Sequence, residues 1–372
     1  MGNFKQWLEI TINNNRDDNY IQSIIKLTDS HKYTVFYGCG TIFHTACEQW
    51  DKYVGKKIHF CCDTSPDAWG KVFNGIPCIS PDELFKMGSD CTVFITANAT
   101  PAIAQYLKGN NVLSINVLDR FNLRHNNFIY SDRLENNKDK IIANLEKNYN
   151  ILADKKSKEI FKAILTRIFS FNNNQFVMST FAESDLYFSS DIIKLTDHEN
   201  FIDAGAYTGD TLEEFLTKTN SKFDRYTAFE PDKNTFSKLK SNVDKIPNNN
   251  KIRVVNMGLW NEVTTVDFNP GGLGSTFGNG SFNVRTTTIN EACKKEKITF
   301  IKMDIEGAEL NALEGGANMI REHEPKLAIS IYHKFEDLWE IPLYLKNINP
   351  EYKIYIRHYS NVDDDTVCYA VK

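Results

Sequence analysis

The chain contains 372 residues, 41% of them hydrophobic and 24% charged, and its formal net charge is -5. This composition is typical of a globular protein, and the length predicts about two domains. The acidic balance provides no broad positive surface, so we expect no nucleic-acid partner. No apolar run approaches the ~18 residues of a membrane span, and no basic start precedes an apolar core, so we expect a cytoplasmic protein without a membrane span.

The cysteines raise the question of a disulfide framework or a metal site, since the chain contains eight of them. Cys61 and Cys62 are adjacent on an expected strand and should point to opposite faces. The sequence has no C-x-x-C pair to chelate zinc. We interpret the cysteines as buried free thiols in a reducing compartment.

Strands and helices alternate in the first third of the chain. Five apolar runs are expected as strands, at residues 33–38, 57–63, 72–80, 92–96 and 112–116, and the run at 72–80 contains turn residues at Asn74-Gly75 and Pro77. One helix should begin after Gly38-Cys39-Gly40, and another at Pro81, because proline is accepted in the first turn of a helix. The alternation predicts a Rossmann-like domain over residues 1–120. Residues 121–190 are polar and rich in asparagine with one apolar stripe, which predicts a helical connector.

The alternation resumes near residue 200 and continues to the end of the chain. The last two expected strands, residues 352–358 and 366–371, are joined by a short polar loop and should be antiparallel. A parallel sheet that ends in an antiparallel hairpin is typical of S-adenosylmethionine-dependent methyltransferases. We therefore predict an α/β fold with two Rossmann-like domains, the second of which, residues 191–372, has a class I methyltransferase sheet ending in that hairpin.

A glycine turn between an apolar strand and a helix is the strongest local signal. Asp203 and Asp210 flank this turn and would repel the pyrophosphate of a dinucleotide, whereas they suit the ammonium and sulfonium of S-adenosylmethionine. Glu230 ends the next strand and should accept hydrogen bonds from the ribose hydroxyls. An unliganded turn is the alternative. The residues predicted to bind the cofactor are Asp203, Gly205, Ala206, Tyr207, Gly209, Asp210, Glu230, Pro231, Gly258 and Leu259.

Acids and a histidine follow two later strands of the same expected sheet. Ligands of open parallel sheets lie at the carboxyl ends of the strands, so Asp304 and His333 should meet the cofactor crevice. His333, with a free pKa of ~6.5, is the predicted general base, and Asp304 is predicted to orient it. The alternatives are a helix cap for Asp304 and a hydrogen-bonded core histidine for His333.

Other residues near these strand ends have weaker signals. Glu306 is a candidate substrate contact, with Glu309 beside it, although both could instead complement a helix dipole. His358 is a second candidate, and it alternates with Arg357 so that one should face inward and one outward. Asp304 and Glu306 could bind Mg²⁺, but two ligands are too few, so we expect no metal. The glycine-rich residues 270–280 are predicted to form a lid.

Residues from about 200 to 372 resemble the FkbM family of methyltransferases. The resemblance rests on five motifs, Ile202-Asp-Ala-Gly-Ala-Tyr-Thr-Gly209, Phe229-Glu-Pro231, Phe300-Ile-Lys-Met-Asp-Ile-Glu-Gly-Ala-Glu309, Ile331-Tyr-His-Lys-Phe-Glu-Asp337 and Ile356-Arg-His-Tyr-Ser360. The likeness implies methyl transfer to an oxygen, usually a hydroxyl of a sugar or a related natural product. It does not identify the acceptor.

The first domain resembles the nucleotide-sugar-binding domains of bacterial sugar-modifying transferases. The likeness rests on Gly38-Cys39-Gly40, on Asp63 and on the run from Asn74 to Leu84, and it implies a ligand at Gly38, Gly40 and Asp63. Phe43 stands where a dinucleotide fingerprint has its third glycine, which argues against a dinucleotide. No acid lies in this turn, so it could accept a diphosphate.

These observations predict an S-adenosylmethionine-dependent O-methyltransferase that acts on a sugar, a sugar nucleotide or a glycan precursor. The expected partner is this small molecule, and a homo-oligomer is possible. Two alternatives remain, an NAD-dependent oxidoreductase or epimerase that uses the first domain, and a non-catalytic nucleotide-sugar-binding protein.

Overall fold

The structure is a computed structural model that describes residues 3–14, 17–97, 100–117, 131–169, 183–247, 249–269, 276–277, 282–294, 296–360 and 364–372. It divides into two compact units. The first unit comprises residues 1–146, 161–182 and 360–363, and the second comprises residues 147–160, 183–359 and 364–372. Both units are built on parallel sheets, which confirms the predicted α/β fold. The predicted boundaries at residues 120 and 190 stay a prediction.

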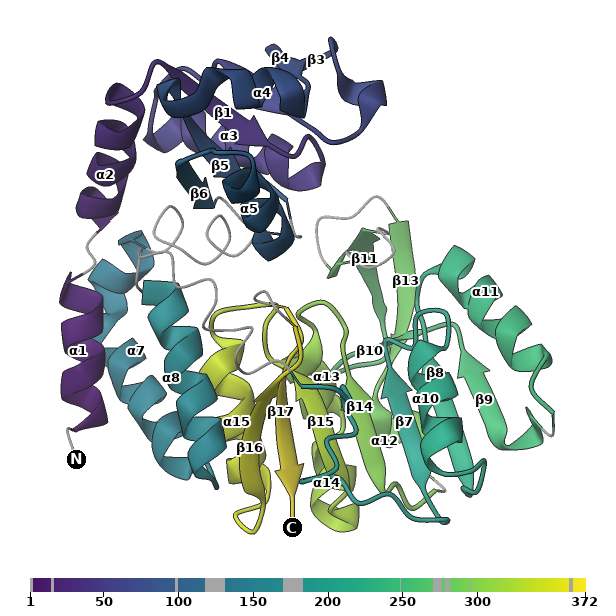
Figure 1. Cartoon of the computed structure of the whole chain (residues 1–372). Coiled ribbons are helices and arrows are strands. Elements are labelled where there is room, and N and C mark those ends of the chain that lie inside the picture. The colour runs from purple at the N-terminus through teal and green to yellow at the C-terminus, as the bar shows by residue number, and fades with distance from the viewer. Residues whose placement is uncertain are drawn as a thin grey trace. The chain divides into compact units, whose positions relative to one another are not determined.

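The first unit contains a six-stranded sheet with the order β3-β4-β2-β1-β5-β6 (Figure 1). Its strands are β1 (Tyr33–Tyr37), β2 (Phe60–Cys62), β3 (Val72–Phe73), β4 (Ile76–Ile79), β5 (Cys91–Ile95) and β6 (Ser114–Val117). All neighbouring strands are parallel except β3 and β4. The strand expected at residues 72–80 is a hairpin instead, because Asn74 and Gly75 have φ of 49° and 77° and reverse the chain.

Helices alternate with these strands as predicted. They are α1 (Phe4–Asn14), α2 (Asp17–Asp29), α3 (Thr41–Tyr53), α4 (Pro81–Met87), α5 (Thr100–Gly109), α7 (Ser131–Ile151) and α8 (Lys155–Phe169), the last two of which extend into the second unit. Ser80 and Glu83 form a capping box around Pro81, which explains the start of α4. Within the described ranges, every helix is too short or too polar to cross a bilayer.

Alternate residues of the first sheet pack into two separate cores. Phe36 and Cys61 lie in one apolar cluster, while Val35 and Cys62 lie in the other. This alternation follows from the pleat of a strand, whose side chains point to opposite faces in turn. The prediction that Cys61 and Cys62 face opposite ways is confirmed.

The second unit contains a seven-stranded sheet with the order β16-β17-β15-β14-β7-β8-β9. Its strands are β7 (Asn200–Ala204), β8 (Arg225–Phe229), β9 (Ile252–Val255), β14 (Phe300–Met303), β15 (Lys326–Ser330), β16 (Lys353–His358) and β17 (Thr366–Val371). Only β17 runs against the others, because it is antiparallel to both β15 and β16. The predicted terminal hairpin is confirmed, and β17 lies inside the sheet rather than at its edge.

The second unit also has a small sheet that was not predicted. It has the order β10-β13-β11-β12 and is formed by β10 (Gly258–Leu259), β11 (Thr265–Asn269), β12 (Thr276–Phe277) and β13 (Phe282–Thr287). Of the predicted lid at residues 270–280, only β12 is described, and the rest lies outside the described residues.

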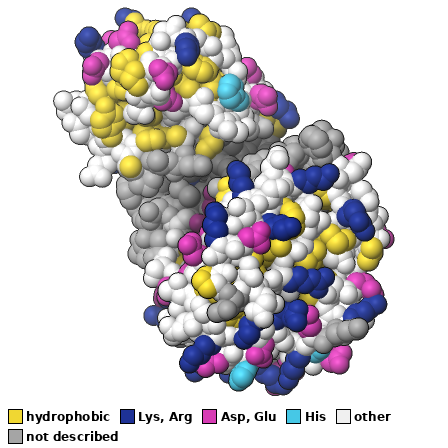
Figure 2. All heavy atoms as spheres, turned by 90° about the vertical axis from the view of Figure 1, so that its right-hand side faces the viewer, with side chains coloured by type: hydrophobic (Ala, Val, Ile, Leu, Met, Phe, Trp, Pro, Cys, Tyr) yellow, Lys and Arg dark blue, Asp and Glu magenta, His cyan; other side chains and the backbone are white. Residues whose placement is uncertain are grey.

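The remaining helices of the second unit are α10 (Asp210–Lys218), α11 (Lys233–Asp244), α12 (Ile289–Ala292), α13 (Glu309–Gly315), α14 (Ala317–His323) and α15 (Asp337–Ile348). Helix α11 is capped by Asp232, whose side chain accepts from the Thr235 N–H at 2.7 Å. Leu239 and Val243 are buried while the helix's lysines are exposed. Figure 2 faces the side of the molecule on which α11 lies in Figure 1, and lysine and arginine side chains are spread over this side. The helix therefore joins the sheet by one apolar stripe.

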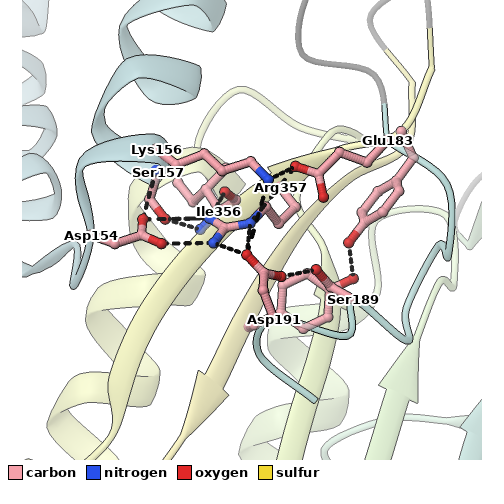
Figure 3. A network of polar contacts seen from close by, with 10 residues as sticks. Asp154, Lys156, Ser157, Glu183, Ser189, Asp191, Ile356 and Arg357 are labelled. Carbon is pink, nitrogen blue, oxygen red and sulfur yellow. Dashed lines mark hydrogen bonds and ion pairs between the residues drawn. The ribbon is translucent and has the colours of Figure 1, made fainter. Parts of the chain in front are cut away.

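Arg357 ties the edge strand β16 to the segments that cover it (Figure 3). Its guanidinium lies 2.7 Å from the carboxylates of both Asp154 and Asp191 and donates to the Ser157 hydroxyl at 2.9 Å. The chain at residues 152–157 pairs along this edge, where the Ala153 N–H donates to the Ile354 carbonyl. Because this edge is covered, Arg357 and His358 are both buried, and the expectation that one of them faces outward is wrong.

Candidate active site

The turn after β7 has an unusual backbone. Gly205, Tyr207 and Gly209 have φ of 78°, 47° and 99°, which lie in the left-handed region. The N–H groups of Gly205 and Ala206 both donate to the Phe229 carbonyl, at 3.1 and 3.0 Å, so the turn folds over the end of β8. Gly209 then serves as the N-cap of α10, and Asp210 is exposed in its first turn. The sequence placed this turn correctly.

Glu230 joins this turn to the end of β8. Its Oε2 accepts from the Tyr207 N–H at 3.1 Å, and its Oε1 accepts from the Asp232 N–H at 2.8 Å. The side chain is only 7% exposed, and this burial raises the pKa of Glu230 to about 7. Asn256 supports the same corner, because its amide donates to the carbonyls of Glu230 and Pro231. The corner therefore presents a desolvated carboxyl group beside the glycine turn.

Asp203 lies beneath the turn and is fully buried. Its carboxylate is 3.0 Å from the Lys302 ammonium on β14 and accepts a hydrogen bond from the Tyr226 hydroxyl. Burial alone would lower the pKa of Lys302, but the charges of Asp203 and Asp304 raise it. Lys302 neutralises the charge of Asp203. Asp203 therefore does not attract the positive groups of the cofactor directly, contrary to the expectation from the sequence.

Lys302 also organises the turn itself. Its ammonium donates to the Gly205 carbonyl at 2.7 Å and to the Ala204 carbonyl at 3.3 Å. The ring of Tyr187 lies over the same ammonium, 5.0 Å from its centroid. One buried cation thus links β7, β14 and the residues around 187.

The loop after β14 comes very close to the turn after β7. A Cβ atom added to Gly205 would lie 1.9 Å from the Asp304 carbonyl oxygen. No side chain fits in that space, which is why the position needs glycine in addition to its positive φ. The contact fixes Asp304 relative to the turn.

Asp304 and His333 meet, as the sequence predicted. His333 Nε2 lies 3.3 Å from Asp304 Oδ1 and 3.6 Å from Glu306 Oε2. Asp304 Oδ2 accepts from the Tyr187 hydroxyl at 2.5 Å, and the Tyr332 hydroxyl donates to Oδ1 at 3.1 Å. Burial would raise the pKa of Asp304, but the nearby positive charges lower it, so the group is a carboxylate.

Glu309 faces the other nitrogen of the same imidazole. Its Oε1 lies 3.0 Å from His333 Nδ1 and accepts from the Ile305 N–H at 2.8 Å. The side chain is fully buried in the first turn of α13, so Glu309 contacts His333 rather than solvent. Burial would lower the pKa of His333, but Glu309 and the other acids raise it to about 9. The expectation that His333 titrates near neutral pH is therefore revised, and at pH 7 it is an imidazolium.

The same groups have the spacing of a metal site. Ligand atoms of Asp304, Glu309 and His333 lie within 4.8 Å of one another. However, Nδ1 faces Glu309 while Nε2 faces Asp304, so a single ion could not use both sides of the ring. We interpret the group as an imidazolium held between carboxylates, and the expected absence of a metal stays a prediction.

The candidate ligand residues of the first unit form a similar corner. Asp63 Oδ2 accepts from the Cys39 N–H, and its Oδ1 accepts from the Ser65 N–H, both at 2.9 Å. This matches Glu230, which also holds the turn after a first strand and the N–H two residues beyond itself. Gly38 is crowded by Ala97 and Thr96, whereas Gly40 faces open space.

The structure assigns no role in this centre to several of the predicted residues. Gly258 and Leu259 are buried in β10, paired with Thr286 and Thr287, so their part in cofactor binding stays a prediction. His358 is fully buried, and its Nδ1 lies 2.9 Å from the Thr366 hydroxyl. The predicted substrate contact at His358 therefore lacks an exposed side chain. Glu306 remains a candidate, since 21% of its side chain is exposed.

Lys302, Tyr187 and Tyr332 were missed by the sequence analysis. Lys302 gave one usable signal, because it interrupts an otherwise apolar buried strand and such a lysine needs a buried partner. Tyr187 gave none, since it lies far from the motif in sequence. Its hydroxyl nevertheless contacts Asp304.

Comparison with known proteins finds a family that matches part of the second unit. Residues 203–352 match the family described as methyltransferase FkbM domain. This part of the chain is similar to methyltransferase domains, and members of methyltransferase families generally use S-adenosylmethionine. The search of curated proteins found no match.

Among solved structures, methyltransferase FkbM from Methylobacillus flagellatus KT is similar over almost the whole chain. It has a TM-score of 0.75 and 22% identity, with 93% of this chain and 92% of that chain covered. Precorrin-6y C5,15-methyltransferase from Geobacter metallireducens GS-15 matches with a TM-score of 0.34 and 11% identity, covering 54% of this chain and 96% of that one. The first likeness shows a shared fold, and the second is too low to support an argument.

We predict that Gly205→Ala disrupts the second unit. The new Cβ would clash with the Asp304 carbonyl, and φ of 78° disfavours alanine, so the free energy of unfolding should fall by ~3 kcal/mol or more. Chemical denaturation followed by circular dichroism measures this.

Gly40→Ala is the matched control, because a Cβ at Gly40 meets nothing within 4 Å and its φ is -84°. Gly40 is also the N-cap of α3, where alanine is less favourable than glycine, so the free energy of unfolding should fall by no more than ~1 kcal/mol. Equal losses in both variants would contradict the proposed close contact.

Proposed function

We propose that the protein is an S-adenosylmethionine-dependent O-methyltransferase whose acceptor is a hydroxyl of a sugar, a sugar nucleotide or a glycan precursor. The observation that supports it most is the position of Glu230, a desolvated carboxyl group clamped to the turn after the first strand of the second sheet. The match of residues 203–352 to a methyltransferase domain supports the same proposal.

The residues around Glu230 suit the nucleoside end of this cofactor. Within the described part of the chain, two backbone N–H groups donate to this carboxyl group, which is 7% exposed, so the group gains stability when ribose hydroxyls also donate to it. Gly205 and Gly209 allow the backbone to turn tightly beside this carboxyl group, because their positive φ angles favour glycine. When bound, S-adenosylmethionine supplies an electrophilic methyl group on a positively charged sulfur.

His333 and the acids around it are the groups that remove the proton from the acceptor. Its Nε2 is on the side of Asp304 and Glu306, whose side chains are 23% and 21% exposed, while Nδ1 faces the buried Glu309. Nε2 is itself buried, so the proton of an acceptor hydroxyl reaches it by way of these two partly exposed carboxylates, once Nε2 has lost its own. The surrounding carboxylates stabilise the imidazolium that results, and Glu306 is positioned to accept from an acceptor hydroxyl.

A second candidate function concerns the first unit. The Asp63 carboxylate holds the Cys39 N–H just as Glu230 holds the Tyr207 N–H, which favours binding of a nucleoside ribose there. We propose that this unit binds a nucleotide sugar. A cytoplasmic location and a homo-oligomer stay predictions.

The cofactor assignment predicts pH-dependent binding of S-adenosylhomocysteine. Ribose hydroxyls donate to the ionised form of Glu230, whose pKa is about 7, so affinity should fall as pH decreases below 7. We expect it to be about tenfold weaker at pH 6 than at pH 8. In Glu230→Gln it should be ~10–100-fold weaker at pH 8 and independent of pH in this range. Isothermal calorimetry measures both effects.

Asp63→Asn is the matched control, because it removes the equivalent carboxylate from the first unit and should leave this affinity unchanged. Absence of binding by the unmodified chain, or unchanged binding by Glu230→Gln, would refute the cofactor assignment.

The proposed base predicts an alkaline pH profile. Transfer of an isotopically labelled methyl group to an extract of sugar nucleotides should rise with pH up to about 9, where His333 loses its proton. His333→Gln should lower the rate by ~10²–10⁴-fold and leave S-adenosylhomocysteine affinity intact. Mass spectrometry of the labelled product measures the rate.

The free energy of unfolding gives a second test of His333, because measuring it requires no acceptor. Because folding raises the pKa of His333, its contribution to stability is present below pH 6.5 and is lost as pH rises through about 9. His333→Gln should remove this dependence, whereas His198→Gln, whose side chain is 83% exposed, should keep it. A methyl-transfer rate that does not change between pH 6 and 9 would contradict the role proposed for His333.

A further inference from the structure

Three cysteines of the first unit bring their sulfur atoms together, although they are far apart in sequence. The Sγ atoms of Cys39, Cys61 and Cys78 all lie within 4.8 Å of one another, and those of Cys39 and Cys78 are 3.7 Å apart. None of the three belongs to a disulfide. They are also separate from the groups proposed for methyl transfer, which all lie in the second unit.

The sheet explains why these thiols meet. Cys61 on β2 and Cys78 on β4 are direct partners in the parallel pairing, so their side chains lie on one face. Cys39 lies in the turn after β1, held by the hydrogen bond from its N–H to Asp63. Cys61 and Cys78 are buried in an apolar cluster, while Cys39 is half-buried at its edge. The turn thus brings the sulfur of the half-buried Cys39 next to the sulfur atoms of two buried cysteines.

The spacing of the sulfur atoms suits metal coordination. Thiolates bound to zinc at ~2.3 Å in tetrahedral geometry are separated by roughly 3.8 Å, close to the 3.7 Å observed between Cys39 and Cys78. Cys39 also lies next to the N-terminus of α3, whose dipole stabilises negative charge.

We propose that Cys39, Cys61 and Cys78 form a three-thiolate site for a thiophilic metal ion, either Zn²⁺ or Cu⁺. Soft sulfur ligands select these two ions. Zn²⁺ leaves less net negative charge in the apolar cluster, and water at the Cys39 side completes its tetrahedron. Cu⁺ accepts three ligands without a fourth. Each thiol releases its proton to solvent as its sulfur–metal bond forms, so no oxidant is required.

The test uses the full chain, reduced and stripped of metal. Titration with Zn²⁺ against a chromophoric chelator, and with Cu⁺ against bicinchoninate, should show one ion bound per chain for at least one of the two. Co²⁺ should give a thiolate-to-metal charge-transfer band, which reports sulfur ligands directly. In Cys39→Ser the band should be lost and the affinity should fall by about 100-fold or more.

Matched variants show whether these three thiols themselves hold the ion. Cys62→Ser changes a buried thiol on the same strand that faces the opposite core, and it should bind the ion like the unmodified chain. His333→Gln should also bind normally, which excludes the acidic group of the second unit as the site. Circular dichroism of Cys39→Ser, whose thiol is half-buried, confirms that loss of binding is not loss of folding.

Three results would overturn the proposal. One is that the reduced chain binds neither Zn²⁺ nor Cu⁺. Another is that Cys39→Ser binds as tightly as the unmodified chain. The third is that air oxidation joins Cys39 to Cys78 while the reduced chain binds no ion, which would make the cluster a disulfide-forming pair.

Discussion

The buried ion pair between Asp203 and Lys302 is the interaction on which the second unit's site depends. Both residues are nearly inaccessible to solvent, and their charged atoms are 3.0 Å apart. Removing two charges from water is costly, and it is tolerated only where further hydrogen bonds satisfy them. Lys302 meets this requirement through the carbonyls of the turn, and Asp203 through the Tyr226 hydroxyl. The ion pair therefore holds the turn after β7 in one conformation.

The same cation affects the chemistry at the neighbouring strand ends. Lys302 helps to keep Asp304 ionised, and the Asp304 carbonyl lies against Gly205. Asp304 in turn faces His333, which Glu309 holds from the other side. A cofactor turn and a proton-accepting group are thus built from one connected network. A change at Lys302, which contacts both the turn and Asp304, should affect both the turn and the proton-accepting group.

Sequence patterns predicted the parts of this fold that follow from periodicity and topology. The order of strands and helices along the chain predicts the parallel strands and the hairpin of β16 and β17. It also predicts that Asp304 meets His333, because both follow strands of one parallel sheet. Partners that depend on tertiary packing were missed, as with Lys302 under the turn and the three clustered cysteines. The state of His333 was also missed, because its pKa is set by acids whose approach the sequence does not reveal. The small sheet at β10 to β13 was also missed, although Val266 and Phe268 on β11 alternate with polar residues.

A double-mutant cycle on Asp203→Asn and Lys302→Met tests the central claim most directly, with S-adenosylhomocysteine affinity and the free energy of unfolding as readouts. Each single variant leaves one buried charge without its partner and should lose about 3–5 kcal/mol of stability together with cofactor binding. The double variant should lose clearly less than the sum, with a coupling energy of ~1–3 kcal/mol. Strictly additive losses, or normal cofactor affinity in Lys302→Met, would contradict the claim that this pair holds the site together.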